Sequence, residues 1–120
     1  MNKPTVIIGA SPKSDRYSYM ASLKLKEHGH TIYPIGINEG SIENTPILNN
    51  RPILNDVHTI TLYINPSHQE NWLPYLLSLK PQRIIFNPGT ENPKLYSLLE
   101  EYGIEYEEAC TLVLLSLNQY

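Results

Sequence analysis

The stretch Thr5-Val6-Ile7-Ile8-Gly9-Ala10-Ser11 decides the fold that we expect for this chain of 120 residues. Its first part is short, apolar and rich in β-branched residues, and a glycine closes it. Such a run is typical of a strand that is buried on both faces of a parallel sheet. We therefore place residues 5–9 at the centre of a predicted sheet, with a polar loop leading from its carboxyl end.

Segments with strand-like and helical periodicity alternate along the rest of the chain. Further strands are predicted over residues 31–37, 57–64, 83–86 and 104–107, and helices over 20–28, 69–79 and 93–102. Pro34 has no N–H group for the ladder, which predicts that the second strand ends there or lies at an edge. Residues 38–56 form a predicted connection with at most one helical turn, and the apolar tail 111–117 is ambiguous.

Strict alternation of strand and helix predicts a parallel sheet with right-handed crossovers and helices on both faces. The expected fold is a three-layer, Rossmann-like, doubly wound α/β sheet of about five strands. The sequence contains no internal repeat, low-complexity segment or linker. We therefore expect residues 1–120 to form one domain.

Composition narrows the classes of function. Nine Lys and Arg residues are scattered among twelve Asp and Glu residues, which argues against a nucleic-acid partner. No apolar run reaches the ~20 residues that span a bilayer, and the opening Met1-Asn2-Lys3-Pro4 leads into a strand instead of a signal peptide. One cysteine allows neither an internal disulfide nor a Cys-rich zinc site. We expect a cytoplasmic protein without membrane contact.

The loop after the first strand, residues 9–19, has the chemistry of a phosphate site. It combines Gly9, hydroxyl groups, the cations Lys13 and Arg16, and the start of a helix. Free N–H groups and the positive end of the helix dipole suit an anion there. The loop has neither the G-x-G-x-x-G fingerprint nor a Walker A ending. The alternative is a capped helix start in which Ser14 or Asp15 accepts from backbone N–H groups.

Later strand exits carry further candidates at the same edge of the sheet. Asn65-Pro66-Ser67-His68 and Asn87-Pro88-Gly89-Thr90 each offer amides, although turn formation and helix capping explain Ser67 and Thr90 as well. Glu39 lies beyond the position where an acidic residue binds the ribose of a dinucleotide, so NAD(P) is not favoured. The histidines show no metal-ligand spacing. Trp72 lies at helical spacing within an apolar pattern, which favours packing.

Cys110 lies at the carboxyl end of the fifth predicted strand, and His68 belongs to the same edge. Cys110 is either packed against a ligand or the core, or it acts as a nucleophile. In the second case the protein is a CoA-dependent or NAD(P)-linked enzyme that uses Cys110 or His68. No activating partner for either residue is evident from the sequence.

The ordered set of strand exits resembles a known family. Val6-Ile7-Ile8-Gly9-Ala10-Ser11 with Arg16, Ile32-Tyr33-Pro34-Ile35, Thr61-Leu62-Tyr63-Ile64-Asn65-Pro66, Phe86-Asn87-Pro88-Gly89-Thr90-Glu91-Asn92 and Glu108-Ala109-Cys110 are similar to the stand-alone CoA-binding domain proteins. These are small bacterial cytosolic proteins, similar to the CoA-binding domain of the succinyl-CoA synthetase alpha subunit. The resemblance covers essentially the whole chain.

The resemblance implies a parallel sheet in the order 3-2-1-4-5 that binds CoA or acyl-CoA across the strand ends. The positions that match the family's binding loops are Gly9, Ala10, Ser11, Arg16, Tyr17, Ser18, Pro34, Gly36, Ile37, Asn65, Pro66, Asn87, Gly89 and Asn92. If a phosphate lies at the helix start, its charge predicts Lys13 or Arg16 as the counter-ion. Many family members have Pro-Lys after the fifth-strand cysteine, where this chain has Thr111-Leu112. The phosphorylated histidine loop of the synthetase has no counterpart here.

Three interpretations of function follow from the sequence. The first is a module that binds CoA or acyl-CoA and needs no catalytic group. The second is the enzyme that uses Cys110 or His68. The third is a subunit with a vestigial cleft whose apolar tail, residues 112–117 and Tyr120, packs on another chain. The two sheet edges and the tail also offer surfaces for a homodimer.

Overall fold

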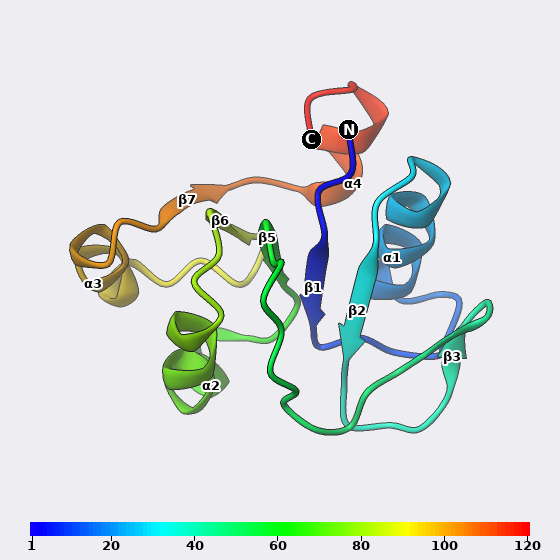
Figure 1. Ribbon diagram of the computed structural model, residues 1–120, viewed down its shortest axis with the longest axis horizontal. Coiled ribbons are helices and arrows are strands. Elements are labelled where there is room, and N and C mark those ends of the chain that lie inside the picture. Colours follow the sequence, from blue (N-terminus) through cyan, green and yellow to red (C-terminus); the bar gives the residue numbers. More distant parts are fainter.

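The computed structural model describes residues 1–120. Its centre is a sheet of five strands, β1 (Thr5–Ile8), β2 (Ile32–Ile35), β5 (Thr59–Leu62), β6 (Arg83–Phe86) and β7 (Glu105–Glu108). Their order is β2-β1-β5-β6-β7, and every neighbouring pair is parallel (Figure 1). β1 and β5 bury all their residues, because both of their faces are covered. The predicted Rossmann-like α/β class is confirmed.

Helices cover the two faces of the sheet and give the molecule three layers (Figure 1). Helices α1 (Tyr17–Glu27) and α4 (Thr111–Ser116) lie on one face. Helix α2 (Pro66–Ser78), the 3₁₀ turn η1 (Pro93–Leu95) and helix α3 (Tyr96–Glu101) lie on the other. None of these helices combines the length and the apolar character needed to cross a membrane.

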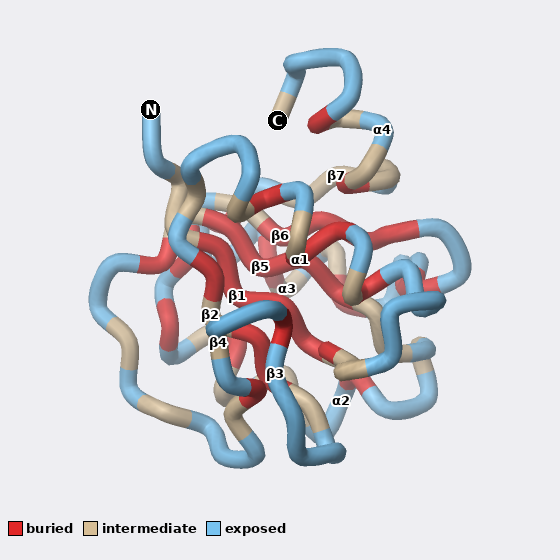
Figure 2. The backbone as a smooth tube through the Cα atoms, turned by 90° about the vertical axis from the view of Figure 1, so that its right-hand side faces the viewer, coloured by how far each residue is buried: buried red, intermediate tan, exposed pale blue.

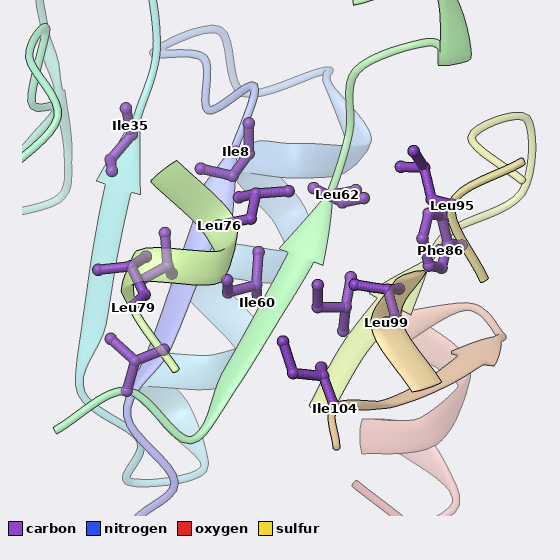
Figure 3. Packing of buried hydrophobic residues seen from close by; sticks show 13 residues of the cluster. Ile8, Ile35, Ile60, Leu62, Leu76, Leu79, Phe86, Leu95, Leu99 and Ile104 are labelled. Atoms are coloured by element: carbon purple, nitrogen blue, oxygen red, sulfur yellow. The ribbon is translucent and has the colours of Figure 1, made fainter. Parts of the chain in front are cut away.

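The core divides into two clusters because successive strand side chains point to opposite faces. Ile7 packs with Leu25 of α1, whereas Ile8 packs with Leu76 of α2. Figure 3 shows the larger cluster, and Figure 2 shows the buried strands enclosed by exposed turns. Full burial of one such side chain contributes about 1.5–3 kcal/mol. The two clusters together fix the helices on the sheet and thereby position the loops at its carboxyl edge.

The third predicted strand lies at a different place in the sheet from the one expected. In the order 3-2-1-4-5 the third predicted strand, residues 57–64, would lie outside the second. Instead β5 pairs directly with β1, with Thr59 opposite Thr5, so the five strands run 2-1-3-4-5 in chain order. A single parallel bridge between Leu48 and Ile35 fills the outer place that the expected order gives to a third strand. The segment around Leu48 has too short an apolar run to continue that pairing.

Two segments that the sequence left open acquire defined structure. Residues 38–56, predicted to be a connection with at most a helical turn, contain no helix but a short antiparallel pair, β3 (Ser41–Ile42) and β4 (Thr45–Pro46). Ile42 is fully buried in the cluster under α1, which anchors this pair. The ambiguous tail forms α4, and Leu115 packs into the same cluster. Pro34 lies in the edge strand β2, as predicted.

Candidate functional site

The main cavity lies at the carboxyl ends of β1, β2 and β5. It has a volume of about 400 Å³. Its walls come from the loops after these strands and from the first turns of α2. The lining residues are Gly9, Ala10, Ser11, Lys13, Arg16, Gly36, Ile37, Asn38, Ile64, His68, Asn71 and Trp72. The first loop, the second-strand exit and α2 therefore meet at one site, as expected for an open α/β sheet.

Helix α1 begins at this cavity without a side-chain cap. Arg16 is the N-cap residue, and neither Ser14 nor Asp15 accepts a hydrogen bond from the first turn. The first hydrogen bond of the helix runs from Met20 N–H to the Arg16 carbonyl, at 3.1 Å. The three N–H groups of residues 17–19 therefore have no acceptor in the protein. This finding contradicts the alternative of a capped helix start.

The potential at this helix start is positive. The side chains of Lys13 and Arg16 are exposed beside the uncapped first turn. The Asp15 carboxylate lies 3.9 Å from Arg16 Nε in an exposed pair, which neutralises little of the charge. Two cations, the helix dipole and free N–H groups together form a site for an anion.

The glycines at positions 9 and 36 allow neighbouring loops to approach each other. A Cβ atom on Gly36 would lie 2.1 Å from the Ala10 carbonyl oxygen, and one on Gly9 would lie 2.7 Å from the Tyr63 carbonyl oxygen. Gly9 also has a φ of +93°, which favours glycine. The N–H groups of Gly9 and Ala10 both donate to the Ile35 carbonyl at 2.9 Å. These glycines therefore fix the loops, and the N–H groups without a protein acceptor include that of Ser11 and those of the first turn of α1.

A second hollow, of about 320 Å³, continues the cavity beyond β2. The two share Gly36, Ile37 and Trp72 as walls. The Arg51 guanidinium stacks 3.9 Å from the Trp72 ring centroid, and its Nη1 donates to the Asn71 carbonyl at 3.1 Å. This end of the site therefore offers a flat cationic pair that suits an aromatic ring and a negative charge.

In the other direction the cavity continues toward β7. A hollow of about 240 Å³ shares Gly9, Ser11 and Arg16 with the main cavity. It is followed by one of about 310 Å³, which we call the apolar hollow, lined by Tyr17, Tyr63, Asn87, Pro88, Cys110 and Leu112. The four hollows form what we call the edge groove. Because neighbouring strands lie about 4.8 Å apart, the groove spans roughly 19 Å across five strand ends, which suits an elongated ligand.

The loop after β6 is locked by its own hydrogen bonds. The Asn87 Nδ2 group donates to Thr61 Oγ1 at 2.6 Å and to the Leu62 carbonyl at 2.8 Å, and Asn87 Oδ1 accepts from Thr111 N–H at 2.9 Å. Buried Gln69 donates to the Thr90 carbonyl at 2.7 Å. It also accepts from buried Asn92 at 3.1 Å. The polar groups of these residues hold the fold together and are not free for a ligand.

The structure brings most but not all of the predicted site residues together. Those on the edge groove are Gly9, Ala10, Ser11, Lys13, Arg16, Tyr17, Ser18, Gly36, Ile37 and Asn87. Those that line none of its hollows are Pro34, Asn65, Pro66, Gly89 and Asn92. Pro34 is buried within β2, Asn65 is the N-cap residue of α2, and Pro66 is the first residue of that helix.

Some residues that line the groove were not predicted from the sequence, because they come from helices and distant loops. Trp72 packs against the larger core cluster as predicted, but it also lines two hollows. Arg51 lies in the connection for which no function was predicted. Tyr63 follows β5 directly, and its position at a strand exit is the one signal that could have indicated it. Burial raises the pKa of the Tyr63 phenol well above its usual range.

Cys110 and His68 line different hollows of the groove. No hydrogen bond joins the two side chains, and Cys110 is a half-buried free thiol. The chain has no group of three His, Cys, Asp or Glu residues placed to hold a metal ion. The geometry supplies no pair of an activated nucleophile and its base.

A doubly wound sheet with a groove at its carboxyl edge and an uncapped helix start defines the class of Rossmann-like nucleotide-binding domains. The family model described as CoA binding domain matches residues 3–116. The chain therefore belongs to the CoA-binding domain family, as the resemblance implied. No curated protein matches it.

Solved structures share this fold. An uncharacterized protein of known crystal structure is 48% identical, with a TM-score of 0.97 over 100% of this chain and 99% of that one. Cell-free ID.343 from Thermus thermophilus is 20% identical, with a TM-score of 0.84 over 98% and 90% of the chains. A hypothetical protein from Pyrococcus horikoshii OT3 is 19% identical, with a TM-score of 0.81 over 92% and 79%. The last two show similarity of fold alone.

Proposed function

We propose that this protein binds CoA or acyl-CoA in the edge groove, with the diphosphate at the start of α1. The observation that carries the proposal is the uncapped helix start between two exposed cations, Lys13 and Arg16, in a chain of the CoA-binding domain family. The free N–H groups of residues 17–19 would donate to phosphate oxygens, and the two cations would balance their charge.

The two ends of the groove suggest the direction of the ligand. The adenosine end would lie toward Trp72 and Arg51, where a flat ring can pack and a cation can meet the 3′-phosphate. The pantetheine arm would then run past Tyr17 toward Cys110. This arrangement needs no catalytic residue. Joint catalysis by Cys110 and His68 has no geometric support, because the two side chains lie in separate hollows.

Calorimetric titration with CoA, acetyl-CoA, NAD, NADP and ATP at low and moderate salt tests the proposal. CoA species are expected to bind in preference to the other nucleotides. Arg16→Ala removes charge-assisted hydrogen bonds of about 1.5–3 kcal/mol and should weaken CoA binding at least tenfold. Lys24→Ala is the matched control, because Lys24 is an exposed cation at the far end of the same helix.

The expected result is loss of affinity in Arg16→Ala and wild-type affinity in Lys24→Ala. Absence of CoA binding by the wild-type protein would overturn the proposed function. Equal CoA affinity in the wild type and Arg16→Ala would instead remove the phosphate from the start of α1.

A further inference from the structure

We infer that the apolar hollow between Tyr17, Tyr63 and Leu112 is an acyl-chain subsite, so that the preferred ligand is an acyl-CoA and not free CoA. The inference rests on the proposed function, and it assigns a chemical class to the part of the ligand beyond the pantetheine arm. It is carried by the continuity of the hollow with the proposed phosphate site, by its lack of charged residues and by the engagement of its one amide within the protein.

Continuity comes from shared walls. Tyr17 and Tyr63 bound both the apolar hollow and the hollow next to it, and Arg16 joins that neighbour to the main cavity. A ligand whose diphosphate lies at the start of α1 can therefore extend along one side of Tyr17 into the apolar hollow. The groove changes along this path from two cations to none.

The wall of the apolar hollow contains no charged residue. Asn87 is its one amide, and both ends of that amide are already engaged by Thr61, Leu62 and Thr111. Cys110 contributes a thiol, which packs as a small hydrophobic group. A charged ligand group would lose water here without gaining an ionic partner, whereas an alkyl chain would be favoured.

The rim of the hollow also contains an apolar side chain that the fold does not cover. Tyr17 is 71% exposed although its backbone is fixed at the first position of α1. Leu112, at the second position of α4, also lines the hollow and is partly buried. An acyl chain between these two side chains would remove apolar surface of both from water. The hollow, at about 310 Å³, has room for a short to medium chain in addition to the end of the arm.

The test is a calorimetric series of CoA, acetyl-CoA, butanoyl-CoA and hexanoyl-CoA with the full chain. Each methylene that enters an apolar site contributes about 0.8 kcal/mol, so affinity should rise about fourfold for each one added until the hollow is full. Leu112→Trp should abolish the gain in affinity from CoA to hexanoyl-CoA, because the indole occupies the hollow. Leu117→Trp, an exposed position at the end of the same helix, should keep the gain.

A second measurement does not depend on the folding of a variant. Cys110 is the chain's one cysteine and lines the hollow, so its rate of alkylation by iodoacetamide reports occupancy. At saturation, hexanoyl-CoA should slow alkylation more than acetyl-CoA does, and neither ligand carries a free thiol that would react with the reagent. Equal affinity along the acyl series, or equal protection by both ligands, overturns the subsite while the proposed CoA site stands. Absence of binding by every CoA species overturns both.

Discussion

The loops after β1 and β6 lie at the same edge of the sheet and differ in what their polar groups bind. After β1, the cations Lys13 and Arg16 are exposed, and the first turn of α1 has no acceptor for three N–H groups. After β6, Asn87 is 2% exposed and all its hydrogen-bonding capacity is directed into the protein. The first loop is arranged to bind something external, and the second joins three elements of the fold.

Polar residues at strand exits can therefore contribute either to the stability of the fold or to ligand binding. A buried amide with internal partners contributes to the free energy of unfolding, because its removal leaves other groups unsatisfied. An exposed cation beside an uncapped helix contributes almost nothing to stability and can act on a ligand. Substitutions in the two loops should therefore affect different measurements.

The largest expected effect is that of Asn87→Ala on stability. The substitution leaves the Leu62 carbonyl and Thr111 N–H without their buried side-chain partner, whereas Thr61 Oγ1 keeps its hydrogen bond to Thr111 Oγ1 at 2.8 Å. Because each unsatisfied group costs about 1–3 kcal/mol, we expect a loss of about 3 kcal/mol or more in the free energy of unfolding. Urea denaturation measures it. Exposed Asn55→Ala, outside any helix or strand, is the matched control, expected within about 0.5 kcal/mol of the wild type. A similar loss in both variants would contradict the contrast.

Gly36→Ala should cause the next largest loss in the free energy of unfolding. The substitution tests whether the close contact between two loops of the groove contributes to stability. The new Cβ would lie 2.1 Å from the Ala10 carbonyl oxygen, a backbone atom, so the two loops must separate. Overpacking of this kind costs about 1–3 kcal/mol, and we expect the upper part of that range from thermal and urea unfolding. Gly89→Ala in the β6 loop meets no atom within 4 Å and should cost only about 1 kcal/mol, from its positive φ. An equal cost at both positions would show that the loops can move apart freely.

Ionic strength should affect CoA binding at the first loop but not the stability contribution of the β6 loop, and this effect should be smaller than those of the two substitutions. The cations of the first loop are exposed, and the Debye length falls from about 30 Å at 0.01 M to about 3 Å at 1 M ionic strength. We expect CoA affinity to fall severalfold over this range, and the dependence to weaken in Arg16→Ala. The stability difference between the wild type and Asn87→Ala should stay constant, because that network is buried. Salt-independent CoA binding would argue against phosphate contact by Lys13 and Arg16.

The smallest expected effect is the pH dependence of stability that comes from Tyr96, which packs against β6. Tyr96 packs edge-on against Phe86 at a centroid distance of 5.1 Å and donates to Glu108 at 2.7 Å. Burial, together with this hydrogen bond to a carboxylate, raises the pKa of Tyr96 to about 12. The folded state therefore holds the proton more tightly than the unfolded chain, whose tyrosine pKa is about 10, so stability falls as pH rises from about 10 to about 12. In urea unfolding, Tyr96→Phe should lessen this fall, whereas exposed Tyr102→Phe should not.

Much of the fold could be predicted because its signals are local. The predicted strand 83–86 has the bounds of β6, and the run at residues 5–9 forms the buried strand β1. The strand order could not be predicted in the same way, because β5 and Leu48 compete for positions through pairings that are distant in sequence. The tail remained ambiguous for a similar reason, since α4 is fixed by distant contacts of Leu115 in the cluster under α1 and of Thr111 with Thr61 and Asn87.

The candidate site divides in the same manner. Gly9, Lys13 and Arg16 follow the central strand directly, so their position at the ligand edge was predictable. Trp72 and Arg51 come from a helix and a long connection, and only folding brings them to 3.9 Å from each other. Asn87 and Asn92 match the family's loops, but their burial and their partners arise from contacts with β5, α2 and α4.

The sequence by itself determined the alternating strands and helices, and with them the edge of the sheet where a ligand would bind. It could do so because periodicity and strand exits are properties of short segments. The tertiary structure decided which polar residues at that edge are free. That outcome depends on whether a distant group satisfies each donor and acceptor: the Asn87 side chain is satisfied by Thr61, Leu62 and Thr111, whereas the first turn of α1 is not satisfied by any residue of the chain.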